Sequence, residues 1–240
     1  MFMVMSDYYQ QLAPLLLEPI NRTHRLYLEN HLELLSEEHQ QFLARLVNEC
    51  NDHSSERQEL RIRQELFRDI RERSKKERNW NTKEFIRAAY VNKFGGLTLD
   101  IPPKLAGIEH YLSVPSYAGW TERMITMNKI CLRHTIVYAQ VECASSTELI
   151  AEMNYCLGRL FVQTSPIVSQ HVQKRILSYY EDAHNTYTYE HYPLQYAKVL
   201  EAIGEAYMWY PLADKQENAC IALKFYERAS NIRSTYDSLP

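Results

Sequence analysis

The strongest constraint on the fold is an internal repeat in the second half of this chain of 240 residues. When the sequence is shifted by 46 residues, small and apolar residues fall on residues of the same kind without a gap. The matching pairs are Ala151 with Ala197, Leu157 with Ile203, Gly158 with Gly204, Phe161 with Tyr207, Leu177 with Leu223, Tyr180 with Tyr226, Ala183 with Ala229 and Asn185 with Asn231. A period of this length is typical of architectures in which one supersecondary unit recurs and stacks on the next.

Each copy of the repeat predicts a helical hairpin. Its first helix carries LGRLF or IGEAY, and its second carries ILSYYEDA or ALKFYERA. Because glycine has no side chain, it allows a second helix to approach closely, so we expect Gly158 and Gly204 to lie at the two hairpin crossings. One hairpin cannot bury its apolar face alone, so neighbouring hairpins should stack.

The pattern resembles the tetratricopeptide repeat, whose signature is Leu-Gly-x-x-Tyr in the first helix and Ala-x3-Phe-x2-Ala in the second. The matching residues are Leu157, Gly158, Phe161, Ile176, Tyr180 and Ala183, then Ile203, Gly204, Tyr207, Ala222, Tyr226 and Ala229. The resemblance implies an all-α fold that ends in two hairpins of α-solenoid type, at about 146–186 and 192–236. The chain departs from the family in a hairpin loop about six residues longer, which gives its period of 46 instead of 34. Two family positions differ as well. The family's tryptophan is replaced by Asn154 in the first repeat and Leu200 in the second, and its closing proline is replaced by Thr188 and Ser234. The alternative is an ordinary four-helix arrangement.

The resemblance also implies a binding groove along the first helix of each hairpin. Its positions correspond to Glu152, Tyr155, Arg159 and Val162 in the first repeat, and to Lys198, Glu201, Glu205 and Met208 in the second. Acidic residues alternate here with Arg159 and Lys198, unlike the basic clamp that holds a C-terminal carboxylate. The expected function is therefore that of a protein–protein adaptor or regulatory scaffold that binds an internal peptide segment or a folded partner.

The remainder of the chain also indicates helices. Only six glycines are present, and residues that favour helix dominate. Ser36 precedes two glutamates in the manner of an N-cap, and Asn81 with Glu84 resembles a capping box. We predict an N-terminal helical region at 1–96, a connection containing Pro and Gly at 97–119, and a helical region at 120–240. Residues 105–141 are a candidate for a degenerate third hairpin.

A long apolar seam marks the start of the C-terminal region. Its residues are separated alternately by four and three positions: Trp120, Met124, Met127, Cys131, His134, Tyr138 and Val141. This spacing predicts a helix that packs in a coiled coil or bundle. Cys131 and His134 are then expected to be a packed thiol and a core histidine rather than a catalytic or metal-binding pair.

The main functional alternative is a nucleic-acid-associated regulator. Residues 56–78 hold nine basic and six acidic residues, which is a net charge of +3. The basic residues that would form a phosphate-binding ridge are Arg71, Arg73, Lys75, Lys76 and Arg78. Interleaved glutamates instead favour a solvated helix that is stabilised by pairs of opposite charge one turn apart.

Enzyme function is the third alternative, with catalytic residues scattered in sequence. The chain contains no phosphate-binding loop, dinucleotide fingerprint or HExxH motif. Glu181 and His184 have the spacing of a di-iron helix, but such a site needs a second pair and two further glutamates. We therefore expect no catalysis, no metal and no cofactor.

The composition indicates a soluble protein of the cytoplasm. The net charge of −3 predicts no general attraction to nucleic acid or membrane, and no segment approaches the length of a membrane span. Five widely spaced cysteines without a CxxC pair are typical of free thiols in a reducing compartment.

The final helix, predicted at 218–236, carries more apolar residues than one neighbouring hairpin covers. Repeat arrays need a polar cap at each end, and no such helix follows in this sequence. Either the N-terminal helices fold back over this face or a second chain covers it. We expect a second chain, near Tyr226, Ile232 and Tyr236, with a homodimer as the commonest solution and a hetero-partner as the next.

Overall fold

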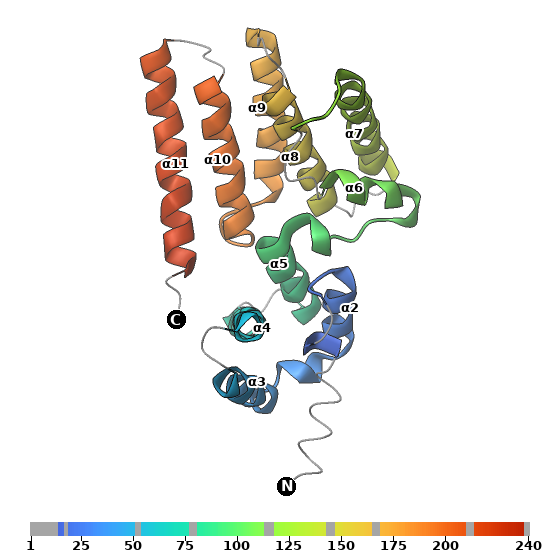
Figure 1. Cartoon of the computed structure of the whole chain (residues 1–240), viewed down its shortest axis with the longest axis vertical. Coiled ribbons are helices and arrows are strands. Elements are labelled where there is room, and N and C mark those ends of the chain that lie inside the picture. The colour runs from blue at the N-terminus through green and yellow to red at the C-terminus, as the bar shows by residue number, and fades with distance from the viewer. Residues whose placement is uncertain are drawn as a thin grey trace. The chain divides into compact units, whose positions relative to one another are not determined.

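The computed structural model describes residues 14–16, 19–50, 54–76, 81–112, 118–142, 147–164, 169–209 and 214–237, and Figure 1 shows the whole chain. The described residues form helices and no strand, which confirms the predicted all-α class. The chain divides into two compact units, Met1–Tyr90 and Val91–Pro240. No helix in the described ranges is long and apolar enough to cross a membrane.

The N-terminal unit is built from short helices with local end signals. It contains α2 (Arg22–Asn30), η1 (Leu32–Leu35), α3 (Glu37–Glu49), α4 (Ser55–Lys76) and most of α5 (Thr82–Phe94). The Ser36 hydroxyl accepts a hydrogen bond from the His39 amide, as predicted for an N-cap. Asn81 and Glu84 form the predicted capping box, with reciprocal bonds of 3.0 and 2.9 Å. Residues 1–13 and 17–18 of the helical region predicted at 1–96 lie outside the described residues.

Helix α4 supplies the core of this unit. Its apolar residues Leu60, Leu66, Phe67 and Ile70 are buried. The Arg63 guanidinium is buried beside them, and its Nε donates to the Leu15 carbonyl at 2.7 Å. A buried cation is tolerated only when its donors are satisfied, so this contact ties the first helical residues to α4.

Residues 95–112 connect α5 to the rest of the C-terminal unit. Gly95 ends α5 with a φ of +61°, a conformation that favours glycine. Short turns follow: η2 (Gly95–Thr98), η3 (Pro103–Ile108) and α6 (Glu109–Leu112). Within 105–112 and 118–141, the only long helix is the one that begins at Glu122, which corresponds to the second helix of the suggested third hairpin.

The rest of the C-terminal unit is a row of long helices packed in chain order (Figure 1). Helix α7 (Glu122–Glu142) packs against α8 (Thr147–Thr164). Helices α8 and α9 (Gln170–Thr186) form one hairpin, and α10 (Pro193–Trp209) and α11 (Lys215–Asp237) form the next. The two hairpins coincide with the two sequence repeats.

The close contacts inside the hairpins recur at the period of 46. A Cβ atom at Gly158 would lie 2.5 Å from Tyr180 Cε1, and a Cβ at Gly204 would lie 3.1 Å from Tyr226 Cε1. Stacked aromatic pairs recur as well, Phe161 with Tyr179 at 5.9 Å between centroids and Tyr207 with Phe225 at 6.0 Å. The prediction that both glycines mark hairpin crossings is confirmed.

The prediction that the seam is the buried face of α7 is wrong. The buried residues are Asn128, Leu132, Ile136 and Ala139, whereas seam residues such as Met127 and His134 are exposed. The helix has two apolar stripes, and α8 covers the other one. His134 is therefore not a core histidine.

We predict that alanine at the two glycine crossings has different effects. Gly158→Ala should destabilise the protein by about 1–3 kcal/mol, because Tyr180 is fully buried and has no room to move. Gly204→Ala should cost less than Gly158→Ala, because its Cβ would lie 3.1 Å from the partly exposed Tyr226 ring and 3.2 Å from the Ala222 carbonyl oxygen, and helix propensity favours alanine. Urea denaturation measures both, and equal stability of the two variants would contradict the packing described here.

Candidate protein-binding face

A buried ion pair joins the first helices of the two hairpins. The Glu152 carboxylate on α8 is only 2% exposed. Lys198 Nζ on α10 donates to its Oε1 at 2.9 Å, and the Tyr187 hydroxyl donates to its Oε2 at 3.0 Å. Residues 152 and 198 occupy the same position in the two repeats, so each repeat contributes one charge to this contact.

Further hydrogen bonds extend this cluster. The Tyr192 hydroxyl donates to Glu148 Oε1 at 2.9 Å, and Lys198 Nζ also donates to Gln195 Oε1 at 3.2 Å. Gln195 Nε2 in turn donates to the Asn92 carbonyl at 3.1 Å. The second hairpin is thereby tied both to α8 and to the end of α5.

The electrostatics of the cluster indicate a structural role. Lys198 Nζ lies 4.2 Å from the centroid of the Tyr155 ring, within cation–π range. Burial raises the pKa values of Tyr155 and Tyr187, and it raises the pKa of the Cys156 thiol to about 12. The thiol therefore stays protonated at neutral pH and is a packing group rather than a nucleophile.

The groove residues expected in the first repeat are largely covered. Glu152 and Tyr155 are buried, and both contact Lys198 of the second repeat. Arg159 and Val162 are half-buried, and the Arg159 guanidinium lies 5.7 Å from the Tyr155 ring. Thus the resemblance places Glu152 and Tyr155 in an open groove, whereas the structure uses them to hold the hairpins together.

The groove residues expected in the second repeat are more accessible. Glu201 and Glu205 are half-buried, and Met208 is 56% exposed. Glu201 accepts two hydrogen bonds from the Arg233 guanidinium at 2.8 and 2.7 Å. Lys198 is half-buried and bonded to Glu152. The accessible groove residues of the second repeat are therefore Glu201, Glu205 and Met208.

Comparison of equivalent positions defines an open edge on the second hairpin. Tyr180 is fully buried, but its equivalent Tyr226 is 36% exposed. Leu177 and Val162 are half-buried, and their equivalents Leu223 and Met208 are each 56% exposed. We call Met208, Leu223 and Tyr226 the edge face. The first hairpin has a second packed on it, whereas no further hairpin among the described residues packs on the second.

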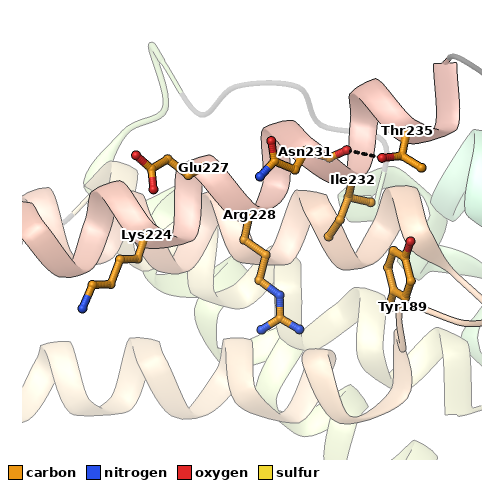
Figure 2. A pocket seen from close by; sticks show the side chains of 7 residues that line it. All are labelled: Tyr189, Lys224, Glu227, Arg228, Asn231, Ile232 and Thr235. Atoms are coloured by element: carbon orange, nitrogen blue, oxygen red, sulfur yellow. Dashed lines mark hydrogen bonds between the residues drawn. The ribbon is translucent and has the colours of Figure 1, made fainter.

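The other side of α11 borders a cavity of about 480 Å³ next to the turn between α9 and α10. Figure 2 shows Lys224 and Arg228 projecting to one side of α11, and Glu227 and Asn231 projecting to the other. The Arg228 guanidinium lies 5.1 Å from the Tyr196 ring. Tyr189, Ile232 and Thr235 also line this open cavity.

The predicted oligomer face is only partly available. Ile232 is 7% exposed and packs with Tyr196, Leu200 and Ala229 inside the second hairpin. Tyr236 is half-buried, and Tyr226 belongs to the edge face. Ile232 is covered by α10, whereas contact of this face with a second chain stays a prediction.

Most of the predicted nucleic-acid ridge is engaged in ion pairs. Arg71 contacts Glu37, Arg73 lies 3.0 Å from Asp69, and Lys75 lies 2.9 Å from Glu72. Lys76 is exposed, and Arg78 lies outside the described residues. The neighbouring carboxylates therefore neutralise much of the charge that phosphate groups would need.

The candidate metal residues are not assembled into a site. Within the described ranges, no three His, Cys, Asp or Glu residues are grouped so as to hold a metal ion. Glu181 is exposed, and the half-buried His184 ring lies 4.7 Å from the Tyr196 ring. Cys131, on α7, is half-buried.

Comparison with known proteins identifies no relative. No family model matches the chain, and neither a curated protein nor a solved structure matches it.

Sequence reasoning missed the buried cluster. Neither Tyr187 nor Glu148 belongs to a sequence motif. They come into contact only because the helices pack together. A signal was nevertheless present, since the two repeats have opposite charges at the equivalent positions Glu152 and Lys198. Opposite charges at one position of adjacent repeats indicate a contact between them.

We predict that Tyr187→Phe destabilises the protein by about 1–2 kcal/mol, because the buried Glu152 carboxylate loses a donor. Tyr189→Phe is the matched control, since Tyr189 is 48% exposed and lies in the same turn. Chemical denaturation of the three proteins measures the difference. If the two variants unfold alike, the hydrogen bond to Glu152 contributes nothing to stability.

Proposed function

We propose that the C-terminal unit is a helical-repeat docking module, of the tetratricopeptide-like α-solenoid type, that binds another protein. One observation supports this most: the second hairpin repeats the contacts of the first, yet its equivalent apolar side chains stay exposed. Hairpin repeats bury such side chains against a neighbour. A partner that packs on the edge face would take the place of that neighbour.

The chemistry of the edge face suggests the kind of partner. Met208, Leu223 and Tyr226 offer apolar surface, and Glu201 and Glu205 lie close enough to Tyr226 to act on it electrostatically. A polar margin around an apolar centre is typical of protein interfaces. An amphipathic peptide segment or the helix of a folded partner fits this arrangement.

The alternatives have less support. The ion pairs of Arg71, Arg73 and Lys75 argue against a phosphate-binding ridge. An enzyme would need an activated nucleophile or an acid–base pair, and the buried Cys156 thiol provides neither. The free thiols Cys50, Cys131, Cys156 and Cys220 fit a reducing compartment, so we propose a cytoplasmic location.

We predict that a photo-crosslinking amino acid at position 208 captures a partner in extracts of the native host. Leu223→Asp should abolish the adduct, because it places a charge in the apolar contact. Thr235→Asp adds the same charge to the side of α11 that borders the cavity and should leave the adduct intact. Adducts that do not respond to Leu223→Asp would contradict binding at the edge face.

A further inference from the structure

A buried histidine connects three segments of the N-terminal unit. His24 of α2 is 1% exposed, and both nitrogens of its ring are hydrogen-bonded. Nδ1 lies 2.7 Å from the hydroxyl of Tyr90 on α5, and Nε2 lies 2.9 Å from the carbonyl oxygen of Leu15. We call His24, Tyr90, Arg63 and the Leu15 carbonyl the His24 cluster.

The Leu15 carbonyl depends on side chains because of the sequence that follows it. Residues 14–16 are helical, so this carbonyl would ordinarily accept from the amide of residue 19, one turn later. Residue 19 is a proline, which has no amide hydrogen. The carbonyl instead accepts from His24 Nε2 and from Arg63 Nε, the latter at 2.7 Å. These two bonds hold residues 14–16 against α2 and α4.

The same bonds determine where the hydrogen of a neutral His24 ring lies. A carbonyl oxygen only accepts, so Nε2 must carry the hydrogen that it shares with Leu15. Nδ1 of a neutral ring then offers a lone pair, and the Tyr90 hydroxyl must donate to it. The hydrogen bonds therefore run in one direction, from Tyr90 through the imidazole to Leu15.

A second proton on the His24 ring would conflict with these surroundings. The Tyr90 hydroxyl could no longer donate to Nδ1. The charged groups that act on His24 and Tyr90 are Arg63 of α4 and, on α2 itself, Arg25 and Glu29, which are bonded to each other. Because that carboxylate is already paired, the buried imidazolium would gain no counter-charge of its own. Burial lowers the pKa of His24 to about 4, against the opposing effect of the Leu15 hydrogen bond.

Solvent reaches the edge of the His24 cluster. Leu16 and Arg63 line a cavity of about 180 Å³ together with residues of α3 and α4. One of these residues is Glu59, whose carboxylate lies 3.4 Å from Arg63 Nη1. Displacement of residues 14–16, which border this cavity, would leave Nε2 of His24 free to bond with water.

We propose that His24 holds residues 14–16 against α2 and α4 while its ring is neutral, and releases them when the ring takes up a proton. The released state lets water solvate the imidazolium, whereas the closed state must bury it. A ring in water has its ordinary pKa of 6.5, which is above the pKa of the closed cluster. The closed state is therefore fully favoured above pH 6.5 and loses stability as the pH falls toward 4. This device belongs to the N-terminal unit and does not rest on the proposed docking function.

Hydrogen–deuterium exchange of the full chain, with rates corrected for the intrinsic effect of pH, tests the release. Protection of the peptide that contains residues 14–16 should fall by roughly 100-fold from pH 7 to pH 4. Protection of α10 should stay constant, and its loss at the same pH would show general unfolding and count against a local release. Residues 14–16 that stay protected at pH 4, or are unprotected at pH 7, would overturn the proposal.

The variant His24→Gln separates the proton from the hydrogen bonds. A glutamine amide can donate to the Leu15 carbonyl and accept from the Tyr90 hydroxyl, but it does not titrate. The pH dependence of residues 14–16 should therefore disappear. The matched control is His31→Gln, since His31 is half-buried at the end of α2, and it should keep the pH dependence. The same pH dependence in His24→Gln as in the parent would contradict the role of this ring.

Nitrogen NMR of the imidazole rings tests the parent chain without any substitution. At pH 7 we expect a neutral His24 ring with its hydrogen on Nε2 and none on Nδ1. A ring that carries its hydrogen on Nδ1, or that is charged at pH 7, would overturn the proposal even if His24→Gln failed to fold.

Discussion

The ion pair between the buried Glu152 carboxylate and the half-buried Lys198 constrains how the two hairpins of the C-terminal unit pack. A carboxylate that is 2% exposed is tolerated only with a nearby cation and satisfied lone pairs. Lys198 and Tyr187 supply both. Because the two charged residues occupy one position of the repeat, the pair fixes which turn of α10 lies against which turn of α8. Apolar packing alone would tolerate other registers, but a shifted register would leave the carboxylate buried without a partner.

Other features of the unit lie within the hairpins and recur in both of them. The hairpins repeat the glycine–tyrosine crossing and the stacked aromatic pair, and the second hairpin presents the edge face. The helices lie in the order α7 to α11, so the row has two ends (Figure 1). Each end carries exposed apolar side chains: the seam of α7 at one end, and the edge face at the other.

Local signals in the sequence predicted the helices well. Caps such as Ser36 and the pair of Asn81 and Glu84 act within one turn, so the sequence contains all that defines them. The period of 46 predicted both hairpins, and it located Gly158 and Gly204 at their crossings. That the hairpins belong to the tetratricopeptide type stays a prediction, as does the binding of a partner.

Which face of each helix is buried could not be predicted in the same way. The spacing on α7 shows that a seam exists, but not that α8 packs on the stripe of Leu132 and Ile136 instead. Similarly, nothing local to Ile232 shows that α10 covers it. The burial of Glu152 and Tyr155 depends on how closely the second hairpin packs on the first. All of these are properties of neighbours distant in sequence, and only the opposite charges of Glu152 and Lys198 hinted at one of them.

A double-mutant cycle on the ion pair tests the central claim most directly. Urea denaturation would compare the parent with Glu152→Met, Lys198→Met and the double variant. Lys198→Met alone leaves a buried carboxylate without its cation, so the double variant should be more stable than this single variant. We expect a coupling free energy of about 1–3 kcal/mol. Additive effects of the two substitutions would show that the pair does not set the register of the hairpins, and would contradict this account.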